Sequence, residues 1–256
     1  MLEENGVRVA AISYDRQDKL KGFAEKYRVG FPLLSDRDSA VIRRFGLFNS
    51  NIAPGLRAHG VPHPVEYLVS PDGQVIRKYF VQNYQHRVTA SAIVLREFGV
   101  AGEDATVMTL RNSELTVQLG LSGSRAFAGQ EIGFIAKFIL TPGWHIYGTP
   151  LPAAYTPASI TFNDPNIIGQ SFKLPPARQM EIRALGETLP VYESSVQGLG
   201  SLLLRFPINA GRLLLSGLLQ FQLCSDNVCE APQVVPFELP LIIEPQVVAG
   251  DRPTFR

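Results

Sequence analysis

The stretch LLLSGLLQFQLCSDNVCEAPQVVPFELPLII, residues 213–243, decides the fold of the C-terminal part of the chain. It consists of two apolar, strand-like runs joined by a short polar segment. Ser225, Asp226 and Asn227 in that segment favour a tight turn. The pattern therefore predicts two strands on either side of a turn that holds Cys224 and Cys229, the two cysteines of the 256-residue chain.

Further strand-like runs precede this stretch at short intervals, and proline and glycine separate them. Many short strands with such punctuation are typical of an antiparallel β-sandwich. We therefore expect an antiparallel β-sandwich over residues 102–256. The other strand-like runs are 105–112, 114–123, 131–141, 158–162 and 202–208.

The first hundred residues follow a different pattern, in which strand-like and helix-like segments alternate. GVRVAAISYD (6–15) suits a strand that is buried on both faces. A hairpin is expected to turn at Pro71-Asp72-Gly73, and TASAIVLREFG (89–99) is expected to form a final helix. This order predicts an α/β domain over residues 1–101.

Composition excludes several classes of protein. The formal net charge is +1, which gives no electrostatic basis for binding nucleic acid or an anionic membrane. No apolar run approaches the length of about 20 residues that a membrane span requires, so direct membrane insertion is not expected. The start of the chain, MLEENGVRVAAISYD, lacks the basic flank of a signal peptide.

Spacing alone leaves the chemistry of the cysteine pair open. A disulfide across so short a ring adds only about 2 kcal/mol by the chain-entropy relation, which makes a purely stabilising staple unattractive. A zinc site requires more ligands than one cysteine pair and His145 provide, and His59 and His63 suit an exposed loop better than a metal. A reversible redox couple, a structural disulfide and two free thiols all remain as interpretations.

Residues 6–99 resemble the AhpC/TSA redoxins of the thioredoxin fold, through VRVAAISYD, FPLLSD, IRRFGL and GVPHPVEYLVSPDG in family order. The resemblance places the family's peroxidatic cysteine before Met1, together with a central strand. No cysteine occurs in residues 1–223, so this chain as given is not expected to be a peroxidase. We expect a fragment of a longer product, although direct pairing of the flanking strands or a replacement segment would also close the gap. The resemblance also makes Pro64 a candidate cis-proline.

The C-terminal part resembles the immunoglobulin-like N-terminal domain of the thiol:disulfide interchange protein DsbD, through TPGWHIYGTPL, FKLPPARQ, LPVYESSVQGLGSLLLRFPI and the cysteine stretch. The resemblance implies that the sandwich is immunoglobulin-like. The resemblance implies thiol–disulfide exchange with redox partner proteins in the periplasm, either thioredoxin-like proteins or membrane-embedded thiol carriers, without a cofactor. It implies that Cys229 forms the mixed disulfide and that Cys224 resolves it. Trp144 and Tyr147 are the expected shields of the pair, and Tyr192 is expected to be a core residue.

We therefore predict that Cys224 and Cys229 form a disulfide that exchanges with protein dithiols. One alternative is a protein-binding module with an inert disulfide. The other is the remnant of a peroxiredoxin-type antioxidant whose peroxidatic cysteine lies upstream.

Overall fold

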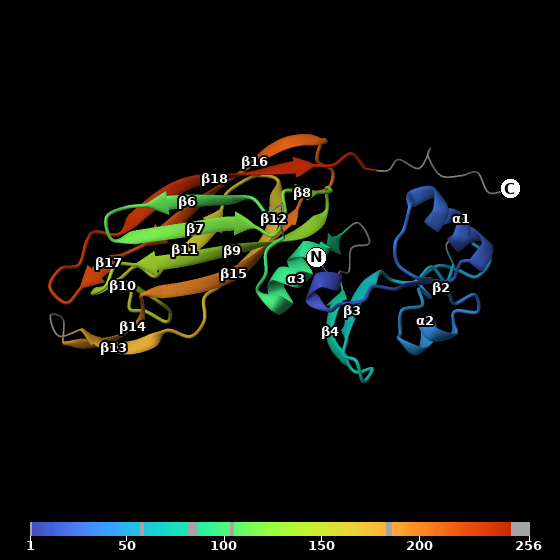
Figure 1. Cartoon of the computed structure of the whole chain (residues 1–256), viewed down its shortest axis with the longest axis horizontal. Coiled ribbons are helices and arrows are strands. Elements are labelled where there is room, and N and C mark those ends of the chain that lie inside the picture. The colour runs from blue at the N-terminus through green and yellow to red at the C-terminus, as the bar shows by residue number, and fades with distance from the viewer. Residues whose placement is uncertain (1, 57–58, 81–85, 103–104, 183–185, 247–256) are drawn as a thin grey trace. The chain divides into compact units, whose positions relative to one another are not determined.

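The computed structural model describes residues 2–56, 59–80, 86–102, 105–182 and 186–246. The chain divides into two compact units, an N-terminal unit (Met1–His86) and a C-terminal unit (Arg87–Arg256). The expected organisation is confirmed: a thioredoxin-like α/β part precedes an antiparallel β-sandwich (Figure 1).

The N-terminal unit contains short elements. Its first two strands pair with each other in parallel, and a helix connects them along the chain. This is the alternation of strand and helix that the sequence predicts. The last two strands form an antiparallel hairpin that turns at Pro71-Asp72-Gly73, as expected, with Gly73 at a φ of 85°. The elements are η1 Glu3–Asn5, β1 Ala11–Ser13, α1 Gln17–Tyr27, β2 Leu33–Ser35, α2 Ala40–Arg44, β3 Val65–Val69 and β4 Val75–Phe80.

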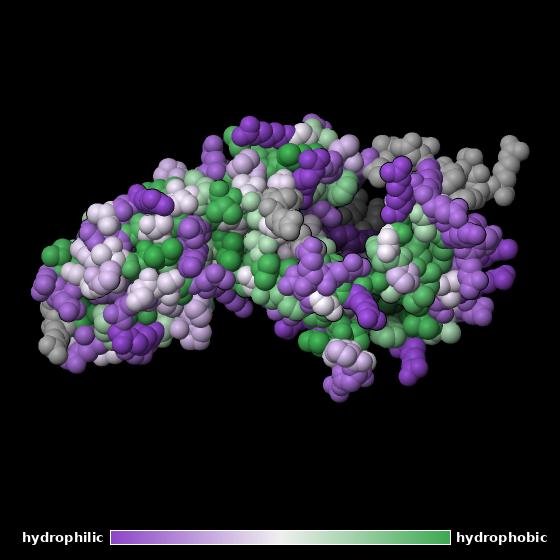
Figure 2. Space-filling model, viewed as in Figure 1, coloured by the Kyte–Doolittle hydropathy of each residue, from purple (hydrophilic) through white to green (hydrophobic). Residues whose placement is uncertain are grey.

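The expectation of a strand buried on both faces is wrong for β1. Ile12 is 42% exposed, and its parallel partner Leu34 is 51% exposed. Among the described residues, β1 pairs with β2 and β3 pairs with β4, but no ladder joins β1 to β3. The two pairs therefore form separate two-stranded sheets, and direct pairing of β1 with β3 does not occur among these described residues. Apolar side chains consequently remain on the surface of this unit (Figure 2).

The C-terminal unit consists of long antiparallel strands and one helix (Figure 1). One sheet has six strands, and two further sheets have four strands each. The elements are β5 Arg87–Val88, α3 Ala90–Phe98, β6 Val107–Arg111, β7 Leu115–Leu121, β8 Arg125–Ala126, β9 Gln130–Leu140, β10 Trp144–Tyr147, β11 Ser159–Phe162, β12 Ile167–Lys173, β13 Arg178–Ile182, β14 Glu187–Glu193, β15 Ser195–Leu204, β16 Gly211–Phe221, β17 Leu223–Ser225 and β18 Gln233–Ile243.

The core of the C-terminal unit lies between the six-stranded sheet, with the order β12-β15-β9-β7-β6 and β5 paired to β9, and the sheet β11-β16-β18-β8. Alternate residues of the long strands are buried, as in β16, where Leu215, Leu219 and Phe221 face inward. Phe134 on β9 is 1% exposed and lies between Phe162 and Phe172. Two apolar faces packed in this way form a sandwich.

Helix α3, which the sequence assigns to the α/β domain, packs on the sandwich. Ala92, Val94 and Leu95 on α3 are buried, and β5 just before the helix pairs in parallel with β9. The Thr89 side chain accepts a hydrogen bond from the Ala92 amide and begins the helix. The two units consequently divide at His86 and Arg87, whereas the sequence places a domain boundary near residue 102.

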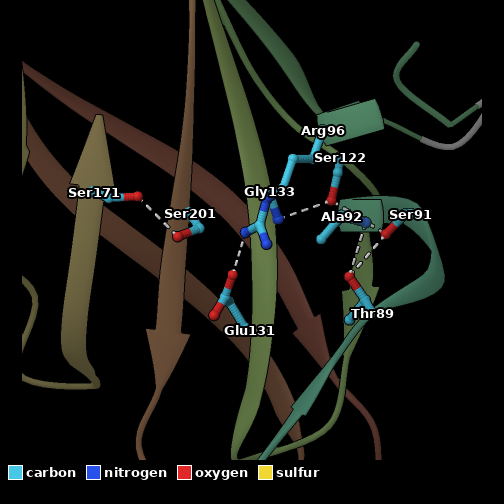
Figure 3. Close-up of polar contacts among 9 residues, drawn as sticks. All are labelled: Thr89, Ser91, Ala92, Arg96, Ser122, Glu131, Gly133, Ser171 and Ser201. Atoms are coloured by element: carbon cyan, nitrogen blue, oxygen red, sulfur yellow. Dashed lines mark hydrogen bonds and ion pairs between the residues drawn. The ribbon is translucent and has the colours of Figure 1, made fainter. Parts of the chain in front are cut away.

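Polar contacts fix α3 to β9 (Figure 3). Ser91 and Ser122 share a hydrogen bond between their hydroxyls, and Ser122 Oγ accepts from the Gly133 amide. Arg96 forms an ion pair with Glu131. Gly133 has no side chain, and a Cβ there would lie 3.0 Å from Leu95 Cδ2 and 3.3 Å from the Ala92 Cα. The close approach of the helix therefore depends on this glycine.

Candidate functional site

The two cysteines lie at the four-stranded sheet of the C-terminal unit whose order is β13-β14-β10-β17. We call it the cysteine sheet. Cys224 belongs to β17, and the chain returns after a turn so that Cys229 forms a β-bridge with Cys224. The two Cα atoms are 4.1 Å apart, and the two sulfurs form a disulfide. The predicted disulfide is confirmed.

Local hydrogen bonds hold the turn between the cysteines. The Ser225 amide donates to the Val228 carbonyl at 2.7 Å, and Ser225 Oγ accepts from the Asn227 and Val228 amides. The Glu230 amide donates to the Leu223 carbonyl on the other side of the pair. Serine side chains commonly bond backbone amides in this way in tight turns. The disulfide is therefore presented on an ordered hairpin.

Cys224 and Cys229 differ in their exposure to solvent. Cys224 is 0% exposed, because it lies in a small apolar cluster with Tyr147, Ile182, Leu189 and Val191. Cys229, at the end of the turn, is an exposed residue. An incoming thiolate must approach one sulfur along the S–S axis. Cys229 is thus the member of the pair that is exposed to solvent.

Tyr147 on β10 contacts both sulfurs. Its hydroxyl donates a hydrogen bond to Cys224 Sγ at 3.1 Å and lies 3.5 Å from Cys229 Sγ. The side chain is fully buried, and burial raises the pKa of the Tyr147 hydroxyl, with smaller contributions in the same direction from Tyr155 and Glu187. The hydroxyl therefore keeps its proton at neutral pH and acts as a donor to sulfur.

Trp144 lies on the opposite face of β10 from the disulfide. Successive side chains on a strand point to opposite faces, so Trp144 and Ile146 share one face, while His145 and Tyr147 share the other. Ile146 belongs to the sandwich core, and Trp144 packs against that core. Tyr147 thus contacts the pair as the resemblance implies, but the position of Trp144 does not support a shielding role.

His145, rather than Trp144, lies on the same face of β10 as the disulfide. It is the direct cross-strand neighbour of Cys224 on β17 and of Glu193 on β14. The residue is 2% exposed, and its Nε2 is buried without a hydrogen-bond partner. Burial lowers the pKa of the imidazole below its ordinary value of 6.5, although Glu193 and Asp226 act in the opposite direction. The signal available in the sequence was its position two residues before Tyr147.

Tyr155 supports Tyr147 from the loop after β10, and sequence reasoning missed it as well. The two rings lie with their centroids 5.3 Å apart, and the Tyr155 hydroxyl donates to Glu187 at 3.2 Å. Burial and the bond to Glu187 raise the pKa of Tyr155. No residue pattern marks Tyr155, because only the folding of the loop brings it to Tyr147.

The remaining expected residues lie elsewhere. Tyr192 is a core residue, as expected, and its hydroxyl donates to the Pro175 carbonyl at 2.6 Å. The cis-proline expected at Pro64 is not found. The cis peptide bonds among the described residues precede Pro150 and Pro207. The short motif around Pro64 does not determine the isomer, because tertiary contacts select it.

The histidines of the loop before β3 have separate contacts. The His59 ring nitrogen Nδ1 lies 2.6 Å from the Ile52 carbonyl oxygen, and the His63 ring packs edge-on against Phe80. In the part of the chain that the structure describes, no three His, Cys, Asp or Glu side chains are grouped as metal ligands. No helix within the same described ranges is long and apolar enough to cross a membrane.

Comparison with known protein sequences finds similarity in the N-terminal part of the chain. Residues 1–78 match the AhpC/TSA family model. Peroxiredoxin Bcp from Escherichia coli is 38% identical over 74 residues, which cover 29% of this chain and 47% of that protein. The putative peroxiredoxin Rv2521 from Mycobacterium tuberculosis is 31% identical over 91 residues, which cover 36% of this chain and 55% of that protein. The chain spans about half the length of these curated relatives.

Among solved structures, the N-terminal periplasmic domain of ScsB from Proteus mirabilis matches with a TM-score of 0.41 and 15% identity, over 55% of this chain and 51% of that chain. The DsbD N-terminal domain of Neisseria meningitidis in its reduced form matches with a TM-score of 0.30 and 12% identity, over 59% and 98% of the two chains. The chain therefore combines a segment similar to the AhpC/TSA family with neighbours among the N-terminal domains of DsbD and ScsB.

Proposed function

We propose that the C-terminal unit carries out thiol–disulfide exchange with redox partner proteins through Cys224 and Cys229. The observation that carries this proposal is the asymmetry of the pair. Cys229 is exposed, whereas Cys224 is fully buried under the Tyr147 hydroxyl. A structural disulfide needs no accessible sulfur, but an exchanging disulfide needs one accessible sulfur and a stabilised leaving thiolate.

The reaction follows from this arrangement. A partner thiolate attacks Cys229 Sγ, the bond between the two protein sulfurs breaks, and its electron pair remains on Cys224 as a thiolate. The product is a mixed disulfide between Cys229 and the partner. Burial alone would disfavour the Cys224 thiolate, but the Tyr147 hydroxyl, 3.1 Å away, donates a hydrogen bond to its sulfur. A second partner thiolate then releases the dithiol, and the reverse sequence oxidises it.

The N-terminal unit contributes no thiol to this chemistry. Residues 1–223 contain no cysteine, so a peroxide cannot be reduced by a thiolate from the segment that matches the AhpC/TSA model. The expected partners are thioredoxin-like proteins or membrane-embedded thiol carriers. We propose an extracytoplasmic site of action, because a disulfide persists there more readily than in the reducing cytosol.

Trapping with cysteine variants tests the proposal. Cys224→Ser leaves Cys229 without its resolving thiol, and Cys229→Ser leaves only the buried cysteine. Each variant is incubated with a thioredoxin that keeps only one active-site cysteine, activated as a mixed disulfide with nitrothiobenzoate, so that no second partner thiol releases the adduct. Adducts are separated by non-reducing electrophoresis. We expect Cys224→Ser to form a covalent adduct that dithiothreitol reduces, and we expect Cys229→Ser to form none.

Two results would contradict the proposal. Equal trapping by both variants would contradict the assignment of Cys229 as the attacked sulfur. Absence of an adduct from both variants, with a wild-type disulfide that reduced thioredoxin does not open, would favour a binding module with an inert disulfide.

A further inference from the structure

His145 is the buried polar group in the site that the exchange reaction does not use. Its register places it directly opposite Cys224, and side chains of directly opposed residues lie on the same face with Cβ atoms about 5 Å apart. The imidazole also packs edge-on against Tyr147, with ring centroids 5.6 Å apart. His145 therefore lies next to the sulfur that leaves and returns during exchange.

The unpartnered Nε2 atom is the second observation. Buried polar side-chain atoms nearly always have a hydrogen-bond partner, and Nε2 of His145 is the exception among the described residues. In the disulfide state, Cys224 Sγ is bonded to Cys229 and carries no proton. Reduction gives Cys224 an S–H group and frees its side chain to rotate. A partner for Nε2 thus exists in the reduced state.

Few other groups around His145 are able to accept a proton from the Cys224 thiol. Tyr147 on β10 is a hydroxyl donor to sulfur, and Glu193 on β14 forms an ion pair with Arg178 on β13. Asp226 lies in the exposed turn after β17. Glu187 accepts from Tyr155. The imidazole is thus the neutral base that faces Cys224 from the neighbouring strand.

We propose that Nε2 of His145 accepts the proton of the Cys224 thiol when Cys224 resolves a mixed disulfide at Cys229. This inference rests on the proposed exchange function. In the step, Cys224 Sγ attacks Cys229 Sγ and its proton passes to Nε2. The disulfide within the protein forms, the bond to the partner breaks, and the partner sulfur leaves as a thiolate. The imidazolium then returns its proton to solvent, so that charge and protons balance.

The lowered proton affinity of a buried imidazole suits this role. At neutral pH the ring is neutral and can accept a proton, while a strongly basic group would already be protonated. Protonation of His145 in acid blocks the step, and the nearby carboxylates of Glu193 and Asp226 favour the transient imidazolium. The resolution rate is therefore expected to depend on a histidine as well as on the thiol.

The test uses the full chain loaded at Cys229 with nitrothiobenzoate, by treating the reduced protein with the corresponding symmetrical disulfide reagent. Attack by Cys224 releases the coloured thiolate, and stopped-flow absorbance gives the resolution rate across a pH series. We expect His145→Gln to resolve at least about tenfold more slowly at neutral pH. We also expect its rate to begin to fall at a higher pH than that of the wild type, because only ionisation of the Cys224 thiol then supplies the attacking thiolate.

His63→Gln is the matched control, because it removes a histidine that lies in the other unit and packs on Phe80. It should keep the wild-type rate and profile. A His145→Gln profile that matches the wild type within twofold at every pH would overturn the proposal. If the variant fails to fold, the unmodified protein provides the second measurement.

That second measurement is an NMR titration of the histidine ring protons in the oxidised and reduced wild-type protein. We expect the His145 titration to move on reduction, because the imidazole gains the Cys224 sulfur as a partner. Identical His145 titrations in the two states would overturn the proposal.

The two proposals fail separately. Trapping of thioredoxin by Cys224→Ser with an unchanged His145→Gln profile would reject only the proton acceptor. A slowed resolution rate in His145→Gln without any trapping would reject only the exchange with proteins.

Discussion

The two units of this chain contrast in how completely they bury their strands. The C-terminal unit has long strands whose alternate residues meet in a core, and it presents an ordered disulfide at the cysteine sheet. The N-terminal unit has strands of three to six residues, and apolar residues such as Ile12, Leu34 and Phe23 remain exposed. Among its described residues the buried apolar side chains are Ile42, Leu47 and Tyr79.

The contrast shows that an apolar sequence does not by itself ensure that a strand is buried. Burial of β1 requires strands or helices on its two faces, whereas among the described residues β1 belongs to a sheet of two strands with exposed apolar residues. The C-terminal unit even includes α3, whose apolar face is covered by β9 and β15. We therefore assign both the stability and the thiol chemistry of the chain mainly to the C-terminal unit.

The largest expected effect comes from the core of the sandwich. Phe134→Ala should lower the free energy of unfolding of the C-terminal unit by about 3–5 kcal/mol, because it removes an aromatic ring packed between Phe162 and Phe172. Leu34→Ala, at an exposed position of the N-terminal unit, should change its stability by less than about 0.5 kcal/mol. Urea unfolding measures both, and equal losses would remove the contrast.

The next effect concerns the hydroxyl at the disulfide. Tyr147→Phe keeps the ring but removes the donor to Cys224 Sγ, so reduction of the disulfide by thioredoxin should slow by roughly tenfold or more. Tyr192→Phe is the matched control, because its hydroxyl bonds the Pro175 carbonyl. A Tyr147→Phe rate equal to that of Tyr192→Phe would show that the hydroxyl does not stabilise the leaving thiolate.

A smaller effect tests the assignment of α3 to the sandwich. Gly133→Val should destabilise the C-terminal unit by about 1–3 kcal/mol, since the new side chain meets Ala92 and Leu95. Hydrogen exchange of residues 90–98 should accelerate with it. Gly169→Val is the control on an outer strand, where a Cβ finds its nearest neighbour at 3.5 Å. Unchanged exchange in α3 would mean that the helix does not depend on β9.

The smallest effect is a dependence of stability on pH. Because the folded-state pKa of His145 is lowered, the unfolded chain binds more protons than the folded chain as the pH falls below 6.5. The neutral imidazole therefore contributes its full stabilisation above pH 6.5. This stabilisation decreases as the pH falls from 6.5 to the folded-state pKa. The slope is at most about 1.4 kcal/mol per pH unit. The difference between wild type and His145→Gln in thermal unfolding at several pH values isolates it, and an identical pH dependence of the two proteins would contradict it.

Much of the sandwich and of the disulfide could be predicted from the sequence, because both depend on local patterns. Alternating apolar residues in 213–243 specify strands with one buried face, and Ser225 and Asn227 specify the turn that brings Cys224 to Cys229. Tyr147 was found through the resemblance of TPGWHIYGTPL. These features need little knowledge of distant contacts.

The remaining features depend on contacts that residue patterns do not encode. The apolar face of α3 predicts that some surface covers it, but not that β9 provides this surface. Whether Trp144 or His145 faces Cys224 depends on the register of β10 against β17, which shifts every side chain to the other face if it moves by one residue. The exposure of β1 depends on what packs on the two-stranded sheet that it forms with β2, and its own residues do not specify this.

The reduction potential of the Cys224–Cys229 pair tests the central claim most directly. Full-length protein is equilibrated with thioredoxin buffers of defined ratio, and the fractions of dithiol and disulfide are measured after rapid alkylation. We predict a potential within the range of thioredoxin-type partners, about −180 to −270 mV. A potential well below about −300 mV, where structural disulfides lie, would show that the pair is a staple and would contradict the exchange function.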